Sequence, residues 1–249
     1  MRRVRAAVQV IVLSLTAAAS RASQPPIHRA SPPSKRTTSG AVARPTSKPG
    51  DAQASSFAKL PPLSLTNINT RKTVALRLYD SSGTVDEQVA QKLDSLLCDA
   101  RDRDDIQTRT IERRLLQLVY RAAYHFSSDK VEVVSAYRKA VRKREGMHAQ
   151  GRAIDFRLSG VAAPTLAAYL RTIPRVGVGI YTHPKTQFVH LDVRDQSFHW
   201  LDASPPRRHW REMNIGSKAL IALDAKYSPK DDWPEGTTPP TVRRADVTK

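Results

Sequence analysis

Hydrophobic and polar residues recur along the chain with two periods, and each period predicts its own set of elements. Alternating positions and short β-branched runs predict strands over residues 63–66, 73–79, 131–137, 153–158, 176–181 and 187–194. Apolar residues at helical spacing predict helices over 84–101 and 110–126, and Pro164 is placed for the first turn of a third helix. Thr84 and Glu87 are spaced as a capping box for the first helix.

The order of these elements predicts the fold class. The first two strands are joined by a short polar segment and should form a hairpin. Two helices, two strands, a third helix and two further strands follow. Because strands and helices are grouped rather than strictly alternating, we expect an α+β domain. Its small antiparallel sheet would have the helices packed on one side.

Both ends of the chain lack this periodicity, which predicts a folded domain over residues 63–210. Residues 1–22 combine an arginine-rich start, a short apolar centre and small residues, as in a secretory signal peptide. The apolar centre is shorter than the roughly 20 residues that span a bilayer, although retention as an anchor stays open. Residues 23–62 are rich in Pro, Ser and basic residues and predict a disordered linker. Residues 211–249 form a C-terminal tail.

Composition makes the protein strongly basic. It has 41 Lys and Arg against 23 Asp and Glu, a formal net charge of +18. An exported protein rarely meets nucleic acid. We therefore expect peripheral contact with an anionic envelope surface and no nucleic-acid partner, unless the charge serves solubility alone. Cys98 is the only cysteine in the sequence, which excludes an intrachain disulfide and a cysteine-based zinc site. It lies on an apolar helical face and is expected in the core.

Three separated residues offer the donors of a catalytic zinc site. His148 precedes the strand that carries Asp155, and His190 lies on the last expected strand. Two imidazoles and one carboxylate would leave the fourth position of a tetrahedral zinc site to water. Asp155 stands between apolar neighbours, where a carboxylate needs a partner. By spacing alone, however, histidines in a chain that has seven are more often surface or core residues than ligands.

The motif around these residues resembles the zinc D,D-carboxypeptidase and murein endopeptidase family of bacterial cell-wall metallopeptidases, whose fold also contains the hedgehog signalling domain. The match begins with His148-x2-Gly151-x-Ala153-x-Asp155 and continues to the strand-borne His190. The murein endopeptidase branch described as a domain of unknown function matches more closely. The stretches that carry this resemblance are residues 63–67, 134–138, 147–158, 177–181, 188–192 and 208–210.

The resemblance implies one zinc ion with three protein ligands, namely His148, Asp155 and His190. For catalysis, three further residues are candidates. Asp192 shares a strand face with His190, so it is either the general base or the partner of an imidazole N–H. Arg138 would stabilise the developing oxyanion, hold a substrate carboxylate or form a plain ion pair. His209 would act as an acid, contact the substrate or cap the surface.

Several departures from the family pattern surround the ligands. Gly146-Met147 stands before the first histidine where the branch has Ser-Leu or similar, and Val193-Arg194 replaces a Thr-Gly pair. Phe188 stands where some relatives have a histidine, and the basic loop before His148 is short. These changes concern the rim of the cleft, so they leave the substrate choice more open than the ligand set.

Together these features predict an exported zinc peptidase of the periplasm or cell envelope. It would be a monomer that hydrolyses cross-links or stem peptides of peptidoglycan with a zinc-activated water, as an endopeptidase or a carboxypeptidase. The alternative is a non-catalytic, zinc-stabilised cell-wall-binding domain, because related folds need not share an activity. A basic envelope or nucleic-acid-binding protein without metal is a third possibility, which stoichiometric zinc would exclude.

Overall fold

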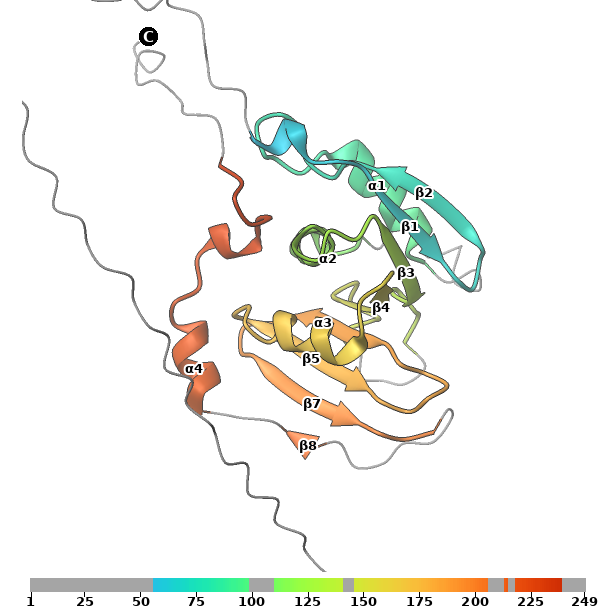
Figure 1. The fold of residues 1–249 in the computed structure, drawn as a ribbon, viewed down its shortest axis with the longest axis vertical. Helices are drawn as coiled ribbons and strands as arrows, with labels where there is room; N and C mark the ends of the chain where they lie inside the picture. The colour runs from blue at the N-terminus through green and yellow to red at the C-terminus, as the bar shows by residue number, and fades with distance from the viewer. Residues whose placement is uncertain (1–55, 99–109, 141–145, 206–212, 215–217, 239–249) are drawn as a thin grey trace, which may run out of the picture. The chain divides into compact units, whose positions relative to one another are not determined.

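One mixed sheet of eight strands, in the order β2-β1-β3-β4-β6-β5-β7-β8, organises the protein (Figure 1). The computed structural model describes residues 56–98, 110–140, 146–205, 213–214 and 218–238. The predicted signal peptide, most of the predicted linker and His209 lie outside these ranges. The strands are β1 Leu63–Asn67, β2 Lys72–Leu76, β3 Lys130–Ser135, β4 Ala153–Leu158, β5 Val176–Tyr181, β6 Val189–Val193, β7 Phe198–Asp202 and β8 Met213–Asn214.

The helices connect and cover these strands. They are α1 Glu87–Leu96, α2 Arg113–His125, α3 Ala163–Leu170 and α4 Lys218–Asp224, with short 3-10 turns η1 Ser56–Lys59 and η3 Pro229–Asp232. Helices α2 and α3 contact β6, with α2 also on β4 and α3 on β5, and their apolar faces share the core with these strands. Cys98 is buried in the same core, as predicted. In the part of the chain that the structure describes, no helix is long and apolar enough to span a bilayer.

The predicted α+β class is confirmed, but the sheet is mixed rather than antiparallel. β1 runs parallel to β3, and β5 runs parallel to β7. The second pair has a simple cause. The chain reverses direction after β5 and again after β6, and β4 already occupies the outer edge of β6. β7 therefore adds beside β5, where two reversals make it parallel. Local sequence patterns do not contain this information.

The start of α1 differs from its predicted position. Asp86 caps the helix, because its Oδ1 accepts hydrogen bonds from the N–H groups of Gln88 at 2.9 Å and Val89 at 3.2 Å. The predicted cap, Thr84, instead donates its backbone N–H to Asp80 at 3.0 Å. The expected capping box was therefore wrong by two residues. A tighter polar turn at Asp80 competes for Thr84 and shifts the cap.

Segments at both ends of the described chain pack on the domain, although the sequence pattern predicts a linker and a tail there. Phe57 of η1 is buried at 1% exposure, and its ring contacts Trp233 with centroids 5.7 Å apart. The Ser56 side chain accepts a hydrogen bond from the Thr238 N–H at 2.8 Å. Asp224 of α4 accepts the Ser197 N–H at 2.7 Å. Residues 218–238 therefore form a C-terminal strap fastened to the domain.

The strap contains the buried Asp232, which is bound by Arg114 at 2.9 Å and by the Tyr227 hydroxyl at 2.7 Å. We expect Asp232→Ala to lower the free energy of unfolding by on the order of 3 kcal/mol, because the Arg114 charge loses its partner in a partly buried site. Chemical denaturation of the purified protein measures this change, with the exposed Asp129→Ala as the control. An unchanged midpoint in Asp232→Ala would show that the strap is held by other contacts.

Candidate metal centre

Strand register brings Asp155 and His190 together. β4 and β6 are antiparallel neighbours, and these two residues are paired directly across them. Paired residues project to the same face of a sheet, so the carboxylate and the imidazole meet there. Their neighbours Ile154 and Leu191 project to the opposite face, where they are buried in the core. The alternation that predicted both strands therefore also places two candidate ligands side by side.

His148 reaches the same place from a turn. Residues 146–151 turn tightly before β4, and the Gly151 N–H donates to the His148 carbonyl at 3.2 Å. Gly151 has a φ angle of +69°, and a Cβ at this position would overlap the Thr110 carbonyl oxygen. Glycine alone avoids both the strained backbone and the overlap. The turn thereby holds the His148 imidazole beside the start of β4.

The donor atoms of the three residues form a small triangle. His190 Nδ1 lies 2.8 Å from Asp155 Oδ1. His148 Nε2 lies 3.3 Å from His190 Nδ1 and 3.5 Å from Asp155 Oδ2. A tetrahedral zinc ion about 2.1 Å from each ligand separates the ligand atoms by roughly 3.4 Å. The cluster, whose donor atoms lie within 4.8 Å of one another, therefore fits zinc in both donor type and spacing.

Each imidazole is also held through its other ring nitrogen. His148 Nδ1 lies 2.6 Å from the Ala136 carbonyl oxygen, which can only accept, so this nitrogen carries a proton and Nε2 is the atom that could bind a metal. His190 Nε2 lies 3.0 Å from Asp192 Oδ2, and a proton on Nε2 leaves Nδ1 as the atom that could bind a metal. Partners of this kind fix the tautomer and the orientation of metal-binding histidines.

The buried charges of the site stabilise one another. Burial favours the neutral form of Asp155, yet hydrogen bonds from His148 and His190 outweigh it and hold the pKa of this carboxyl well below its usual range. Burial likewise opposes protonation of His190, but Asp155 and Asp192 outweigh it and raise the pKa of His190 to about 9. At neutral pH the metal-free imidazole therefore carries a proton that a metal has to displace.

Comparison with known proteins shows the family to which the chain belongs. A family model described as peptidoglycan L,D-endopeptidase MepK, of the M15 peptidase type, matches residues 55–200, more than half of the chain. The chain belongs to this endopeptidase family. The resemblance to the murein endopeptidases is thus confirmed.

Two curated members of the L,D-endopeptidase family show the extent of the similarity. Peptidoglycan L,D-endopeptidase MepK of Escherichia coli strain K12 is 26% identical over 160 residues, which cover 59% of this chain and 79% of that protein. The probable peptidoglycan L,D-endopeptidase MepK of Haemophilus influenzae is 28% identical over 143 residues, which cover 52% of this chain and 74% of that protein. No solved structure matches the chain significantly.

Within this member of the L,D-endopeptidase family, Asp192 lies behind His190. Its side chain is 1% exposed. One oxygen bonds His190 Nε2, and Arg194 donates to both oxygens, with its Nε 2.5 Å from Oδ1. Burial favours the neutral form, but His190 and Arg194 outweigh it and lower the pKa of Asp192. Of the two roles left open by the sequence, general base or imidazole partner, these contacts favour the imidazole partner.

Of the other two catalytic candidates, only Arg138 lies among the described residues. Arg138 is exposed, two residues after the Ala136 carbonyl that holds His148. Within the described ranges, no hydrogen bond or ion pair joins its side chain to the three ligands. His209 lies outside the described residues, so its predicted role stays a prediction.

Strand β7, which is absent from the strands predicted from the sequence, forms a wall of the site. Trp200 stands on this strand opposite Gly179 of β5, where any Cβ would overlap the indole. The absence of a side chain at Gly179 lets the indole approach His190, with ring centroids 5.0 Å apart. Alternation of large residues over 198–202 was the available signal, and the run was short enough to be read as a loop.

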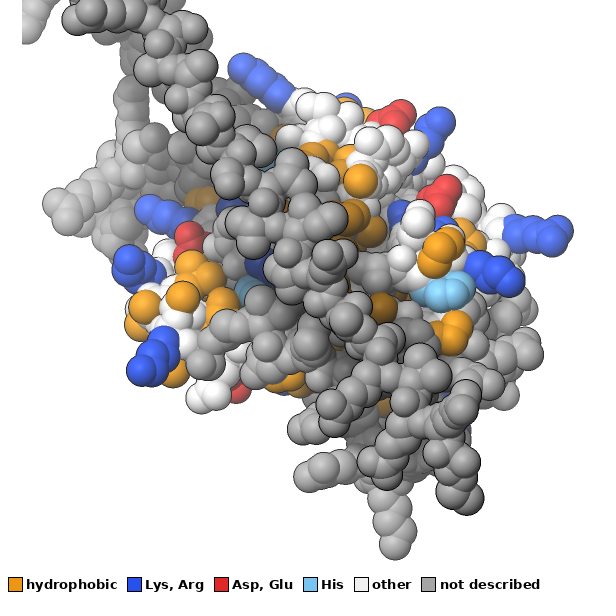
Figure 2. Space-filling view, turned by 60° about the horizontal axis from the view of Figure 1, so that its bottom comes forward, with side chains coloured by type: hydrophobic (Ala, Val, Ile, Leu, Met, Phe, Trp, Pro, Cys, Tyr) orange, Lys and Arg blue, Asp and Glu red, His pale blue; other side chains and the backbone are white. Residues whose placement is uncertain are grey.

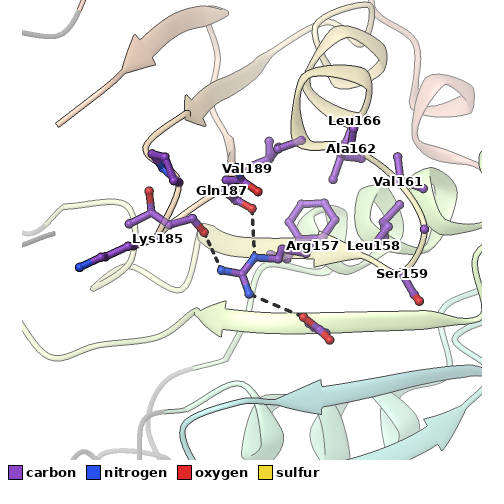
Figure 3. A pocket seen from close by; sticks show the side chains of 15 residues that line it. Arg157, Leu158, Ser159, Val161, Ala162, Leu166, Lys185, Gln187 and Val189 are labelled. Carbon is purple, nitrogen blue, oxygen red and sulfur yellow. Dashed lines mark hydrogen bonds and ion pairs between the residues drawn. The ribbon is translucent and has the colours of Figure 1, made fainter. Parts of the chain in front are cut away.

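A cavity of about 500 Å³ lies at the other end of β4 and β6 (Figure 3). Arg157, two residues after Asp155, is one of the residues that line it. The guanidinium donates to the carbonyl oxygens of Thr186 at 2.6 Å and Gln187 at 3.0 Å, and it approaches Glu132 at 3.7 Å. Its donors are thus used to fasten the β5–β6 connection to β4. Arg157 is a structural residue of the same strand that carries a candidate ligand.

Proposed function

We propose that this protein is an exported zinc metallopeptidase that hydrolyses cross-links of peptidoglycan as an L,D-endopeptidase. The convergence of His148 Nε2, Asp155 and His190 Nδ1, at separations of 2.8 to 3.5 Å, carries the proposal. Membership in the peptidoglycan L,D-endopeptidase family supports the substrate and the reaction class. The proposed location is the periplasm or cell envelope, where the relatives' named substrate is found.

The residues of the cluster have distinct tasks in this proposal. A bound zinc ion would supply a Lewis acid that polarises a peptide carbonyl and makes a water nucleophilic at neutral pH. His148, Asp155 and His190 would hold it, and the net charge of the ligands would be −1 from Asp155. Asp192 would keep the His190 proton on Nε2, which leaves Nδ1 to the metal. Arg138 is exposed and lies two residues after Ala136 in the sequence. We propose that it binds a substrate carboxylate or the developing oxyanion.

The surface of the domain suits an anionic polymer. Figure 2 shows Lys and Arg side chains projecting from several parts of the described surface. On the sheet face that carries the cluster, Phe188 stands two residues before His190 and stacks on Tyr181 with ring centroids 4.3 Å apart. This pair offers an apolar ledge beside the metal site, on which an aliphatic part of a stem peptide could pack.

Digestion of isolated peptidoglycan by the purified protein tests the proposal. We expect new muropeptides by liquid chromatography and mass spectrometry, no products with a zinc chelator, and recovery when zinc is added back. Muropeptides with cross-links from an L-centre to a D-centre should be cut, and those joined between D-centres should persist. Cleavage of peptidoglycan in the presence of the chelator would contradict the zinc mechanism. Stoichiometric zinc and wall binding without cleavage would favour the alternative, a non-catalytic wall-binding domain.

A further inference from the structure

The Asp192 carboxylate occupies a deeply buried position and needs a strong partner. Only 1% of its side chain is exposed. Removing a carboxylate from water costs several kcal/mol unless charge and hydrogen bonds replace the lost hydration. Arg194, two residues further along, supplies both, because its guanidinium donates to the two oxygens at once. Bidentate pairs of this kind fix orientation as well as charge.

The same carboxylate is linked to the candidate metal ligand. Its Oδ2 lies 3.0 Å from His190 Nε2, on the opposite edge of the ring from Nδ1. Nδ1 in turn lies 2.8 Å from Asp155 Oδ1 and 3.3 Å from His148 Nε2. The orientation of the His190 ring, and hence the position of its ligand atom, depends on where Asp192 is held.

The neighbouring strand leaves room for this arrangement. Gly177 of β5 is paired with Asp192, and a Cβ on this glycine would lie 2.5 Å from Asp192 Oδ1 and from a terminal nitrogen of Arg194. Any side chain at position 177 would therefore displace the pair. On its other side, the Arg194 guanidinium lies 5.5 Å from the ring centre of Phe198 and 6.0 Å from that of Trp200. Strand β5 and these aromatic rings together define one position for Arg194.

We propose that Arg194 is a positioning residue of the metal centre: it clamps Asp192, which holds His190 Nε2 and so presents Nδ1 to the metal. The proposal rests on the proposed zinc site and deepens it. Arg194 touches neither metal nor substrate, and it acts through Asp192 and His190. A neutral residue at position 194 would leave Asp192 buried with one oxygen unsatisfied. The carboxylate would then shift toward water and release the imidazole.

Zinc affinity of the purified protein, measured by competition with a chromophoric chelator, tests this role without reference to activity. We expect Arg194→Gln to weaken zinc binding by about 10- to 100-fold, the usual effect of losing a partner behind a metal ligand. Arg194→Lys keeps the charge but loses the bidentate geometry, so the zinc affinity of this variant should lie between that of the wild type and that of Arg194→Gln. Arg157→Gln is the matched control, because it removes the same charge from the same sheet and should keep wild-type affinity within about twofold.

A second readout separates positioning from simple stabilisation. In the zinc-loaded wild type, long-range ¹H–¹⁵N spectra of the histidine rings should show His190 protonated at Nε2. In Arg194→Gln this ring should give mixed or exchanging signals. If Arg194→Gln does not fold, the double variant Asp192→Asn with Arg194→Gln removes both buried charges together and should still lose at least tenfold in affinity.

The outcomes distinguish this proposal from the proposed function. Wild-type zinc affinity and a wild-type His190 spectrum in folded Arg194→Gln, or in the double variant, would overturn the role of Arg194 and leave the zinc site intact. A wild-type protein that binds no stoichiometric zinc would overturn both. Equal losses in Arg194→Gln and Arg157→Gln would show a general charge effect and would also overturn it.

Discussion

Replacing His148 by alanine should leave the protein folded but without zinc, and peptidoglycan hydrolysis should fall by on the order of 10³-fold or more. The reason is the loss of several kcal/mol of charge stabilisation that a bound metal supplies to the reacting carbonyl. His148 comes from a turn outside the hydrophobic core, and its side chain is 12% exposed, so its removal should cost the metal-free protein only the bond to the Ala136 carbonyl and the contact with Asp155. Zinc content by elemental analysis and the rate of muropeptide release measure the two effects.

Matched variants sharpen this test. His125→Ala removes an exposed histidine of α2 and should keep zinc content and rate unchanged. Asp155→Asn keeps the shape of the third ligand but removes its charge, so zinc affinity should fall strongly. Zinc-loaded, fully active His148→Ala would contradict the assignment of the site, whatever the state of the other ligands.

The metal-free protein should be most stable near pH 6.5, because folding shifts the pKa values of two histidines in opposite directions. Asp155 and Asp192 outweigh the effect of burial and raise the pKa of His190 to about 9 from an ordinary value of 6.5. This contribution is fully present below pH 6.5 and is lost as pH rises through 9. The 2.5-unit difference corresponds to on the order of 3 kcal/mol.

His199 limits stability on the acid side. Burial, with a smaller effect of Arg171, lowers the pKa of His199 to about 4. Between these pH values His199 binds a proton in the unfolded chain but not in the folded protein, so stability falls as pH drops from 6.5 toward 4. Chemical denaturation in a chelating buffer from pH 5 to 9 measures both limbs.

The losses of stability above and below pH 6.5 have separate controls. His190→Asn should remove the loss of stability between pH 6.5 and 9 and leave the loss below pH 6.5 unchanged. Zinc should compete with the proton for His190 Nδ1, so zinc binding should tighten over the same interval and the alkaline loss should disappear in zinc-loaded protein. Constant stability of the metal-free wild type from pH 6.5 to 9 would contradict the charged His190 between two carboxylates.

Elements with a strong local period could be predicted from the sequence. The hairpin of β1 and β2, and strands β4 and β5, agree with their predicted ranges to within three residues, because alternating positions and short apolar runs are local signals of a strand. Helix α2 was found within three residues at each end. The N-cap of α1 was predicted two residues too early, since the Thr84 N–H donates to Asp80 and Asp86 caps the helix instead.

Elements defined by distant partners could not be predicted. β7 exists because the edge of β5 is available to it, and η1 and the C-terminal strap are ordered by Phe57, Trp233 and Asp232 in contacts that span most of the chain. None of these segments buries enough apolar surface by itself to form a stable element. Their order is a property of the assembled domain.

For the site, the sequence by itself determined which residues could bind a metal. It gave His148, Asp155 and His190 the right donor types, and it placed Asp155 and His190 on strands whose alternation sets them apart from the core. The tertiary structure decided the rest: the register that pairs Asp155 with His190, the proton on each imidazole, and the placement of Asp192 behind His190 under Arg194. The physical reason is that a side chain type is local, whereas a hydrogen-bond partner and a distance are fixed only when strands far apart in the chain pair.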